Sequence, residues 1–263
     1  MRLLALAVAA TSLLGATSAQ ALELNVSLAG QYWNASPSGE IQGLSTEDPI
    51  ALKDSLGLSS EGATALSLQI DHFLPVLPNL RLSQTQLDLT GQRTANFTFN
   101  GTEFNGQLNN RVDLSHTDVT AYYRLLDGVT SFLPLVTARL ELGVTLRLFD
   151  GEFTVEGSNS NGEQARESIS LSAPVPMGYL GGRLDLPLNL SVGGQVNAIG
   201  YSGNSLSDMS AYLRYQYNAL PLIKPGVELG YRRMSLELDD LDDTYGDLTL
   251  SGPYVGAYLR AGF

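Results

Sequence analysis

The chain has 263 residues, with 27 Asp and Glu against 15 Lys and Arg, which gives a net charge of −12 at pH 7. This acidic balance argues against a nucleic-acid-binding protein, because such proteins need basic surfaces that neutralise phosphates. The chain has no cysteine, so disulfides, a thiol nucleophile and a thiolate metal site are excluded.

Residues 1–21 have the features of a bacterial secretory signal peptide. Met1 and Arg2 give a short positive start, residues 3–16 form an apolar core, and Ala19-Gln20-Ala21 has the small residues that signal peptidase accepts. The apolar core is too short to span a bilayer well as an anchor helix. We therefore expect cleavage after about Ala21 and a single domain over residues 22–263.

Alternation of apolar and polar residues recurs along the whole remaining chain and predicts β-strands. The clearest run is residues 136–149, in which Ala138, Leu140 and Leu142 alternate with Arg139 and Glu141. Ten strands are predicted in this way. In chain order they cover about residues 24–34, 63–73, 80–90, 112–125, 136–149, 174–186, 188–201, 208–218, 226–238 and 248–263.

The connections between these strands alternate between short and long. Strands 2–3, 4–5, 6–7 and 8–9 are joined by short pieces that contain proline, and the other connections are polar and mostly long. Short periplasmic turns and longer extracellular loops are typical of an outer-membrane barrel. We therefore predict an all-β fold, a closed antiparallel transmembrane β-barrel of about ten strands with both termini on the periplasmic side. A soluble β-sandwich is the alternative, but it has no reason to sort its connections by length.

The faces opposite the apolar ones carry charges of both signs, which suits a polar lumen better than a soluble core. With about ten strands the barrel is narrow, so we expect these charges to pair and largely plug it. Aromatic residues near the strand ends suit interfacial girdles. The predicted lumen charges are Asp118, Arg124, Arg139, Glu141, Arg147, Arg183, Asp185, Arg214, Glu228, Arg232 and Arg260. The predicted girdle residues are Tyr32, Trp33, Tyr123, Phe149, Tyr201, Tyr215, Tyr217, Tyr254 and Phe263.

Two of the long connections are expected to continue as hairpins beyond the membrane. Asn100-Gly101 lies between short alternating runs, which is a strong hairpin signal. Residues 150–172, with GSNSNG at the tip, look similar. In residues 35–62, Pro49 after Asp48 either opens one helical turn or belongs to an irregular loop.

Several segments together resemble a group of uncharacterised outer-membrane β-barrel proteins of Gram-negative bacteria. The segments are GQYWNASPSG (30–39), LKDSLGL (52–58), DHFLPVLPNLRL (71–82), VTAYYRLLD (119–127), YLGGRLDLP (179–187) and LSGPYVGAYLRAGF (250–263). The resemblance covers nearly the whole chain after residue 21 and implies the fold and the outer membrane as location, but no activity. The final strand ending at Phe263 resembles the signal read by the barrel assembly machinery.

Few residues offer catalytic chemistry. His116 and Asp118 share one face of a strand, as a base and an orienting carboxylate would. Ten-stranded outer-membrane proteases are similar in strand number, but their set of catalytic acids has no match here. Ser115 faces away from His116, so a Ser–His pair is poorly placed. His72 is expected to tie a short turn.

Two glycine pairs and one acidic segment have structural interpretations. Residues 239–247 contain five aspartates, which suggest a solvated acidic loop more than a cation site, since the spacing does not match a calcium loop. Gly181-Gly182 and Gly193-Gly194 indicate close strand contacts rather than phosphate binding.

We therefore predict a monomeric integral outer-membrane barrel without catalysis, with no assigned catalytic, cofactor-binding or metal residue. Its role would be structural or surface-interacting, with outer-membrane lipid, lipopolysaccharide and the assembly machinery as partners and no nucleic acid. One alternative is a narrow, selective pore for small solutes. A second alternative is an outer-membrane hydrolase of lipid or peptide that uses His116 and Asp118.

Overall fold

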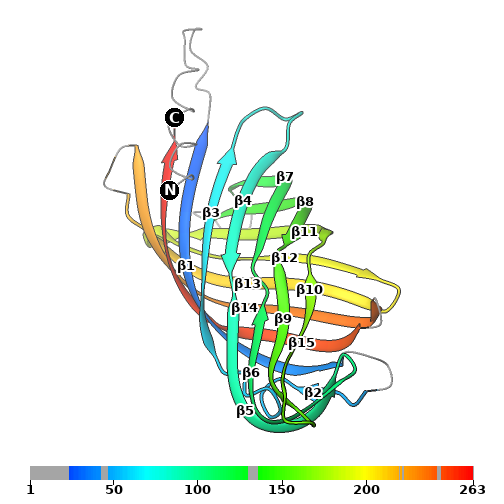
Figure 1. Ribbon diagram of the computed structural model, residues 1–263. Helices are drawn as coiled ribbons and strands as arrows, with labels where there is room; N and C mark the ends of the chain where they lie inside the picture. Colours follow the sequence, from blue (N-terminus) through cyan, green and yellow to red (C-terminus); the bar gives the residue numbers. More distant parts are fainter. Residues whose placement is uncertain are drawn as a thin grey trace, which may run out of the picture.

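The computed structural model describes residues 24–42, 47–129, 136–218, 220, 222–241 and 244–262. The predicted signal peptide and Phe263 lie outside these residues. Ten antiparallel strands form a closed barrel, in which β15 pairs with β1 (Figure 1). The barrel strands are β1 (Asn25–Gln42), β3 (Glu61–Asp71), β4 (Asn79–Gln86), β7 (His116–Val129), β8 (Thr137–Phe149), β11 (Pro174–Leu186), β12 (Leu190–Tyr201), β13 (Asn204–Gln216), β14 (Ile223–Leu241) and β15 (Thr244–Gly262).

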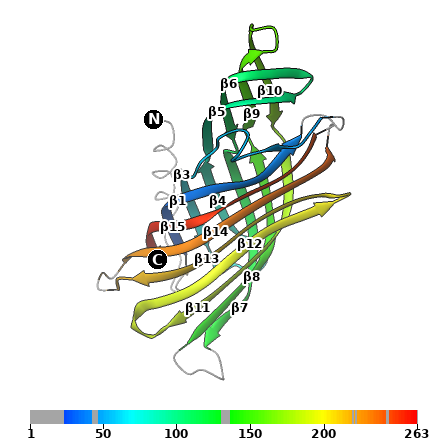
Figure 2. The ribbon, with the colours of Figure 1, turned by 90° about the horizontal axis from the view of Figure 1, so that it is seen from below.

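The closing pair is the one expected from the sequence. Asn25 lies opposite Gly262, and the register runs to Gln42 opposite Tyr245. Figure 2 shows the red strand β15 beside the blue strand β1. Closure satisfies the backbone donors and acceptors that two free sheet edges would leave unpaired in lipid.

An apolar belt covers the outside of the barrel. On β8, Leu140, Leu142, Val144 and Leu146 are each at least 39% exposed, whereas the intervening Glu141, Thr145 and Arg147 are buried. This inversion of the usual pattern is stable only where lipid surrounds the barrel. Among the described residues, no helix is long and apolar enough to cross a bilayer. The closed sheet and its outward apolar belt are those of a membrane-spanning β-barrel.

The connections follow the two predicted classes only in part: on the side away from the chain termini three are long, but β12 and β13 are joined by Ser202 and Gly203 alone. On the side of the chain termini the described turns are short, and one is the 3₁₀ segment η2 (Pro187–Asn189). His72 ties another such turn, because its Nε2 lies 3.0 Å from the carbonyl of Pro78 and its backbone N–H donates to Asn79. This confirms the structural role expected for His72.

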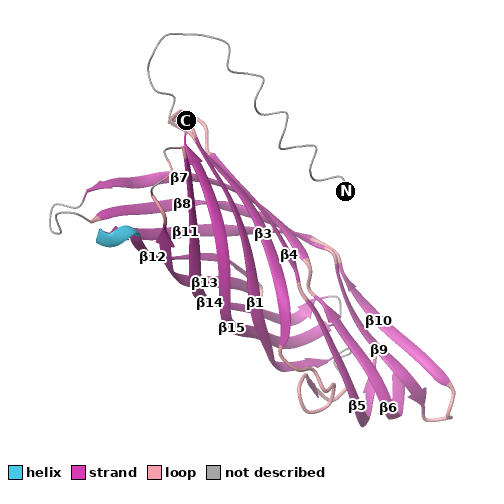
Figure 3. Cartoon of the chain, turned by 90° about the vertical axis from the view of Figure 1, so that its left-hand side faces the viewer, coloured by secondary structure: helices cyan, strands magenta, loops and turns pink. Residues whose placement is uncertain are grey.

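On the opposite side, the two predicted hairpins form and also join each other. The extracellular sheet consists of β5 (Asp88–Phe99), β6 (Thr102–Asp113), β9 (Gly151–Asn159) and β10 (Gln164–Leu171), in the order β10-β9-β6-β5. Asn100 and Gly101 both have positive φ, as a tight two-residue hairpin turn requires. The pairing of β6 with β9 was not predicted. The sheet projects beyond the end of the barrel (Figure 3).

The apolar core of the protein lies between the extracellular sheet and the barrel mouth. Leu52, Leu56 and Leu58 are buried there, together with Phe99 and Phe104 of the sheet. The segment that carries the leucines follows the two-residue strand β2 (Ile50–Ala51), and residues 52–56 form turns. Both alternatives for the region after Pro49 hold in part: the N–H of Ser55 donates to the carbonyl of Ala51 at 3.0 Å, as in a helical turn, but no regular helix follows. We call residues 52–58 the irregular segment, and its buried leucines lie at the mouth.

The expected aromatic girdle is corrected at three positions. Trp33, Phe149 and Tyr254 are buried rather than part of an interfacial girdle, because each alternates with a lipid-facing neighbour and so points inward. Tyr32, Tyr123, Tyr201, Tyr215 and Tyr217 are exposed, as expected for a girdle.

The acidic segment 239–247 is a hairpin rather than a loop. β14 extends to Leu241 and β15 starts at Thr244, with these two residues opposite each other. Asp239 is fixed by Asn204, whose side chain accepts from the Asp239 N–H at 2.9 Å. The five aspartates of this segment hide the apolar–polar alternation that would otherwise predict the ends of these two strands.

Candidate functional site

The lumen contains a cavity of about 370 Å³ with a largely polar wall. It extends from Asn189 and Asn218, beside the short turns, to Asp118, Asp208 and Arg232 nearer the outer end. Inward residues such as Ser27 and Gln31 line it because the neighbouring Leu28 and Tyr32 face lipid. The cavity is therefore a direct product of strand alternation.

Charged side chains along the cavity wall pair with one another, as predicted. Arg214 donates to Glu228 at 2.7 Å, and Glu228 also accepts from Gln31. On the facing wall, Arg81 contacts Glu141 at 3.4 Å. Arg183 pairs with Asp185 at 3.0 Å. The first two of these pairs cross between strands, whereas Arg183 and Asp185 both lie on β11.

The outer end of the cavity is closed by four charged residues, here called the outer ion cluster: Asp118, Arg147, Asp208 and Arg232. Arg147 donates to Asp118 through Nε at 2.8 Å and Nη2 at 2.7 Å, and its Nη2 also reaches Asp208 at 2.7 Å. Arg232 donates to Asp208 at 2.6 and 3.0 Å. Two guanidinium groups thus balance two carboxylates, and the side chain of Arg147 is fully buried.

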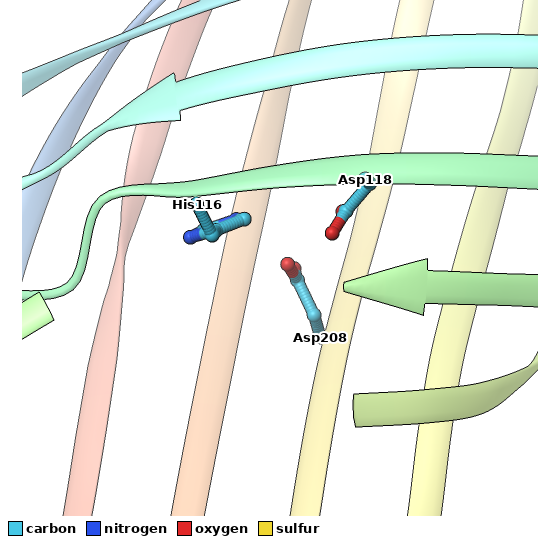
Figure 4. A group of neighbouring side chains, drawn as sticks. All are labelled: His116, Asp118 and Asp208. Carbon is cyan, nitrogen blue, oxygen red and sulfur yellow. The ribbon is translucent and has the colours of Figure 1, made fainter. Parts of the chain in front are cut away.

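His116 lies beside this cluster on β7 (Figure 4). Its Nδ1 is 2.7 Å from the carbonyl of Leu114, so Nδ1 carries a proton and donates it, because a carbonyl only accepts. Its Nε2 faces Arg232 Nη2 at 3.4 Å. The predicted proximity of His116 and Asp118 is therefore present, but the hydrogen bonds of both side chains go to other groups.

His116, Asp118 and Asp208 also place three potential metal-ligating atoms within 4.8 Å of one another. Figure 4 shows the two carboxylates pointing toward each other, with the imidazole at their side. Both carboxylates already accept hydrogen bonds from guanidinium groups. A divalent cation would have to displace these arginines into a buried space, so the donor set suits an ion-pair network rather than a metal.

An apolar layer continues the closure outward from the outer ion cluster. The guanidinium of Arg232 lies over the ring of Trp33 at 4.8 Å, and Arg147 contacts Met234 at 3.4 Å. The indole N–H of Trp33 donates to the carbonyl of Gly252 at 3.2 Å. Trp33 and Met234 also belong to the apolar core under the extracellular sheet. The outer ion cluster and the apolar core are therefore in direct contact.

The sequence prediction missed two important members of the lumen network. Asp208 is the first residue of its predicted strand, so no strand residue before it helps to assign the direction of its side chain. Its spacing from Arg214, six residues later, would have assigned both to one face. Arg81 alternates with the exposed Leu80 and Leu82, which was the available signal for its inward position.

Comparison with known proteins finds solved structures that are similar at low sequence identity. No protein-family model and no curated protein matches the chain. The outer-membrane protease OmpT from Escherichia coli aligns over 94% of this chain and 100% of its own, with 11% identity and a TM-score of 0.43. A FadL homologue from Pseudomonas aeruginosa is also similar; it aligns over 92% of this chain and 90% of its own, with 11% identity and a TM-score of 0.33. The β domain of the Bordetella autotransporter BrkA aligns over 93% of this chain and 100% of its own, with 12% identity and a TM-score of 0.31.

Proposed function

We propose that this protein is a closed, non-conducting outer-membrane barrel with a structural or surface-interaction role and no catalytic activity. The observation that carries the proposal is the contact between the outer ion cluster and the apolar core, which we interpret as a continuous seal at the outer end of the lumen. It consists of the charge-balanced outer ion cluster and the apolar core directly above it. Moving ions through this region would require separating buried ion pairs, which costs about 3–5 kcal/mol or more.

The extracellular sheet is the proposed interaction surface. Its exposed face is polar, and none of its described side chains is a large exposed apolar one. Exposed positions on β5 and β6 include Thr90, Gln92, Thr94, Asn96, Glu103, Asn105, Gln107 and Asn109. Such a face suits hydrated partners, and lipopolysaccharide is the proposed one. We also propose a monomer, assembly through the C-terminal strand, and membership of the uncharacterised barrel group that the sequence resembles.

Planar-bilayer recording tests the closed barrel. We expect the purified wild-type protein to give no discrete conductance steps, with protein-free bilayers and heat-denatured protein as controls. Discrete steps from the folded protein would overturn this proposal in favour of a narrow pore. The polar cavity of about 370 Å³ is the observation that favours this second candidate.

The absence of catalysis is supported by the surroundings of His116 and Asp118. Both are at least 93% buried, and Asp118 is held by a two-bond contact from Arg147, so neither is presented to a bulky lipid or peptide. We expect the purified barrel to leave lipid and peptide substrates intact. Cleavage that is lost in His116→Ala would contradict this part of the proposal.

A further inference from the structure

A second pocket lies outside the lumen, between the extracellular sheet and the outer ends of the barrel strands. It has a volume of about 120 Å³. Ile41 of β1, Leu236 of β14 and Leu248 of β15 form the barrel side of its wall. Val112, Phe153 and Ile169 form the sheet side, and Leu52 of the irregular segment also contributes. We call this space the outer apolar pocket.

The size of the outer apolar pocket limits what enters it. An engineered cavity of about 150 Å³ lined by Leu, Ile and Phe stays dry and binds benzene. A pocket of about 120 Å³ with a similar lining therefore suits one aromatic ring or one short branched alkyl group. Ile41, Leu236 and Leu248 remain partly exposed although they pack against the core, so the pocket borders solvent.

Carboxylates at the edge of the pocket favour a ligand that carries a positive charge. Glu40, Asp113 and Glu152 are the charged residues of its lining, and each is acidic. The nearby arginines are shared with other acids. Arg111, which reaches Asp113 at 3.3 Å, binds Asp88 more closely at 2.7 Å. Arg166 lies 3.7 Å from Glu152 but 2.9 Å from Glu156. The rim therefore keeps a negative potential.

We propose that the outer apolar pocket binds a small lipophilic cation, a single apolar ring or branched alkyl group that carries an ammonium. The apolar wall takes the ring and excludes water from it. The carboxylates of Glu40 and Glu152 attract the ammonium group of the ligand at the rim. A neutral molecule of the same shape lacks this electrostatic attraction. The inference goes beyond the proposed function, because the pocket lies beneath the sheet and outside the lumen.

The test is a titration of the folded, full-length barrel in zwitterionic nanodiscs with 2-phenylethylammonium, followed by the methyl NMR signals of Leu236 and Leu248. We expect saturable shifts. The double variant Glu40→Gln/Glu152→Gln keeps the shape of the pocket and should weaken binding about tenfold, as expected for about 1.4 kcal/mol lost with two partly exposed charges. Glu103→Gln is the matched control, because Glu103 is exposed on β6 and does not line the pocket.

Two further experiments use an uncharged ligand, ethylbenzene, and a variant that blocks the pocket, Ser170→Trp. Ethylbenzene has the same apolar body without the charge and should bind at least fivefold more weakly. Ser170 is an exposed residue of the lining, so the indole of Ser170→Trp should block the entrance and abolish the shifts. Equal binding of ethylbenzene, an unchanged affinity in the double Glu variant, or no saturable shift in the wild type would overturn the proposal. None of these results depends on whether the lumen conducts.

Discussion

Arg147 has no contact with solvent, so its charge depends entirely on its neighbours. A buried guanidinium is tolerated only when carboxylates and hydrogen bonds replace the water that it loses. Asp118 supplies two such bonds and Asp208 a third. Asp208 is in turn neutralised by Arg232. The four residues are therefore interdependent, and the loss of one leaves another without its balancing charge.

We predict that Arg147→Met destabilises the barrel by about 3–5 kcal/mol, because Asp118 then stays buried without the arginine that balances it. Adding Asp118→Asn should recover part of this loss by removing the uncompensated charge. The measurement is the free energy of unfolding in micelles from tryptophan fluorescence. Trp33 is the only tryptophan of the chain and packs on Arg232, so it reports directly on this region.

Arg166→Met is the matched control for Arg147→Met. Arg166 pairs with Glu152 and Glu156, but its side chain is 58% exposed. Exposed ion pairs contribute roughly 0–1 kcal/mol, so this variant should unfold nearly as the wild type does. Equal effects of Arg147→Met and Arg166→Met would show that the outer ion cluster does not stabilise the barrel.

At the residue scale, sequence alternation predicted which side chains face the lumen but not which of them meet. Arg147 and Asp118 were both assigned to the lumen, and they lie opposite each other on β8 and β7. Asp208 comes from β13, three strands away from β8 in the sheet order. Which level of β13 faces Arg147 depends on the stagger of the closed barrel, which a single sequence does not contain.

The strands themselves were predicted well, because lipid on one side and a polar lumen on the other enforce strict alternation. β8 and β11 match the predicted ranges to within one residue. The hairpin at Asn100-Gly101 was predicted for a different reason, the turn chemistry of these two residues. The pairing of β6 with β9 was not predicted, since it joins segments about 50 residues apart and no local pattern encodes it.

We predict that Gly101→Ala costs about 1 kcal/mol, because alanine pays for a positive φ even where its methyl group has open space around it. The loss should be confined to the extracellular sheet, since among the described residues β5 pairs with β6, β6 also pairs with β9, and neither forms a ladder with a barrel strand. Faster amide hydrogen exchange in β5 and β6, with unchanged exchange in β8, is the expected result.

Gly30→Ala serves as the control for Gly101→Ala. Gly30 has no positive φ, and its added methyl group would also meet open space. It should leave exchange unchanged throughout. If Gly101→Ala behaved in the same way as Gly30→Ala, the turn would not depend on its left-handed backbone.

At the scale of the whole molecule, the barrel is stable only once β15 has paired with both β14 and β1. β15 is one of the two longest strands, and its pairing with β1 joins the two ends of the described chain. Closure also completes the outer seal, because Trp33 of β1 binds the carbonyl of Gly252 on β15. The last strand is therefore a suitable element for an assembly machinery to recognise before the barrel is closed.

Assembly through the C-terminal strand, as proposed above, predicts that deleting Phe263 lowers the amount of folded protein in the outer membrane severalfold. Phe263→Tyr keeps an aromatic ring and should assemble normally. Heat-modifiable migration of the membrane fraction on gels measures the folded amount. Refolding of the purified variants in micelles, where no assembly machinery is present, separates recognition from stability. Normal membrane levels of the deletion variant, or an equal defect in micelles, would contradict recognition through Phe263.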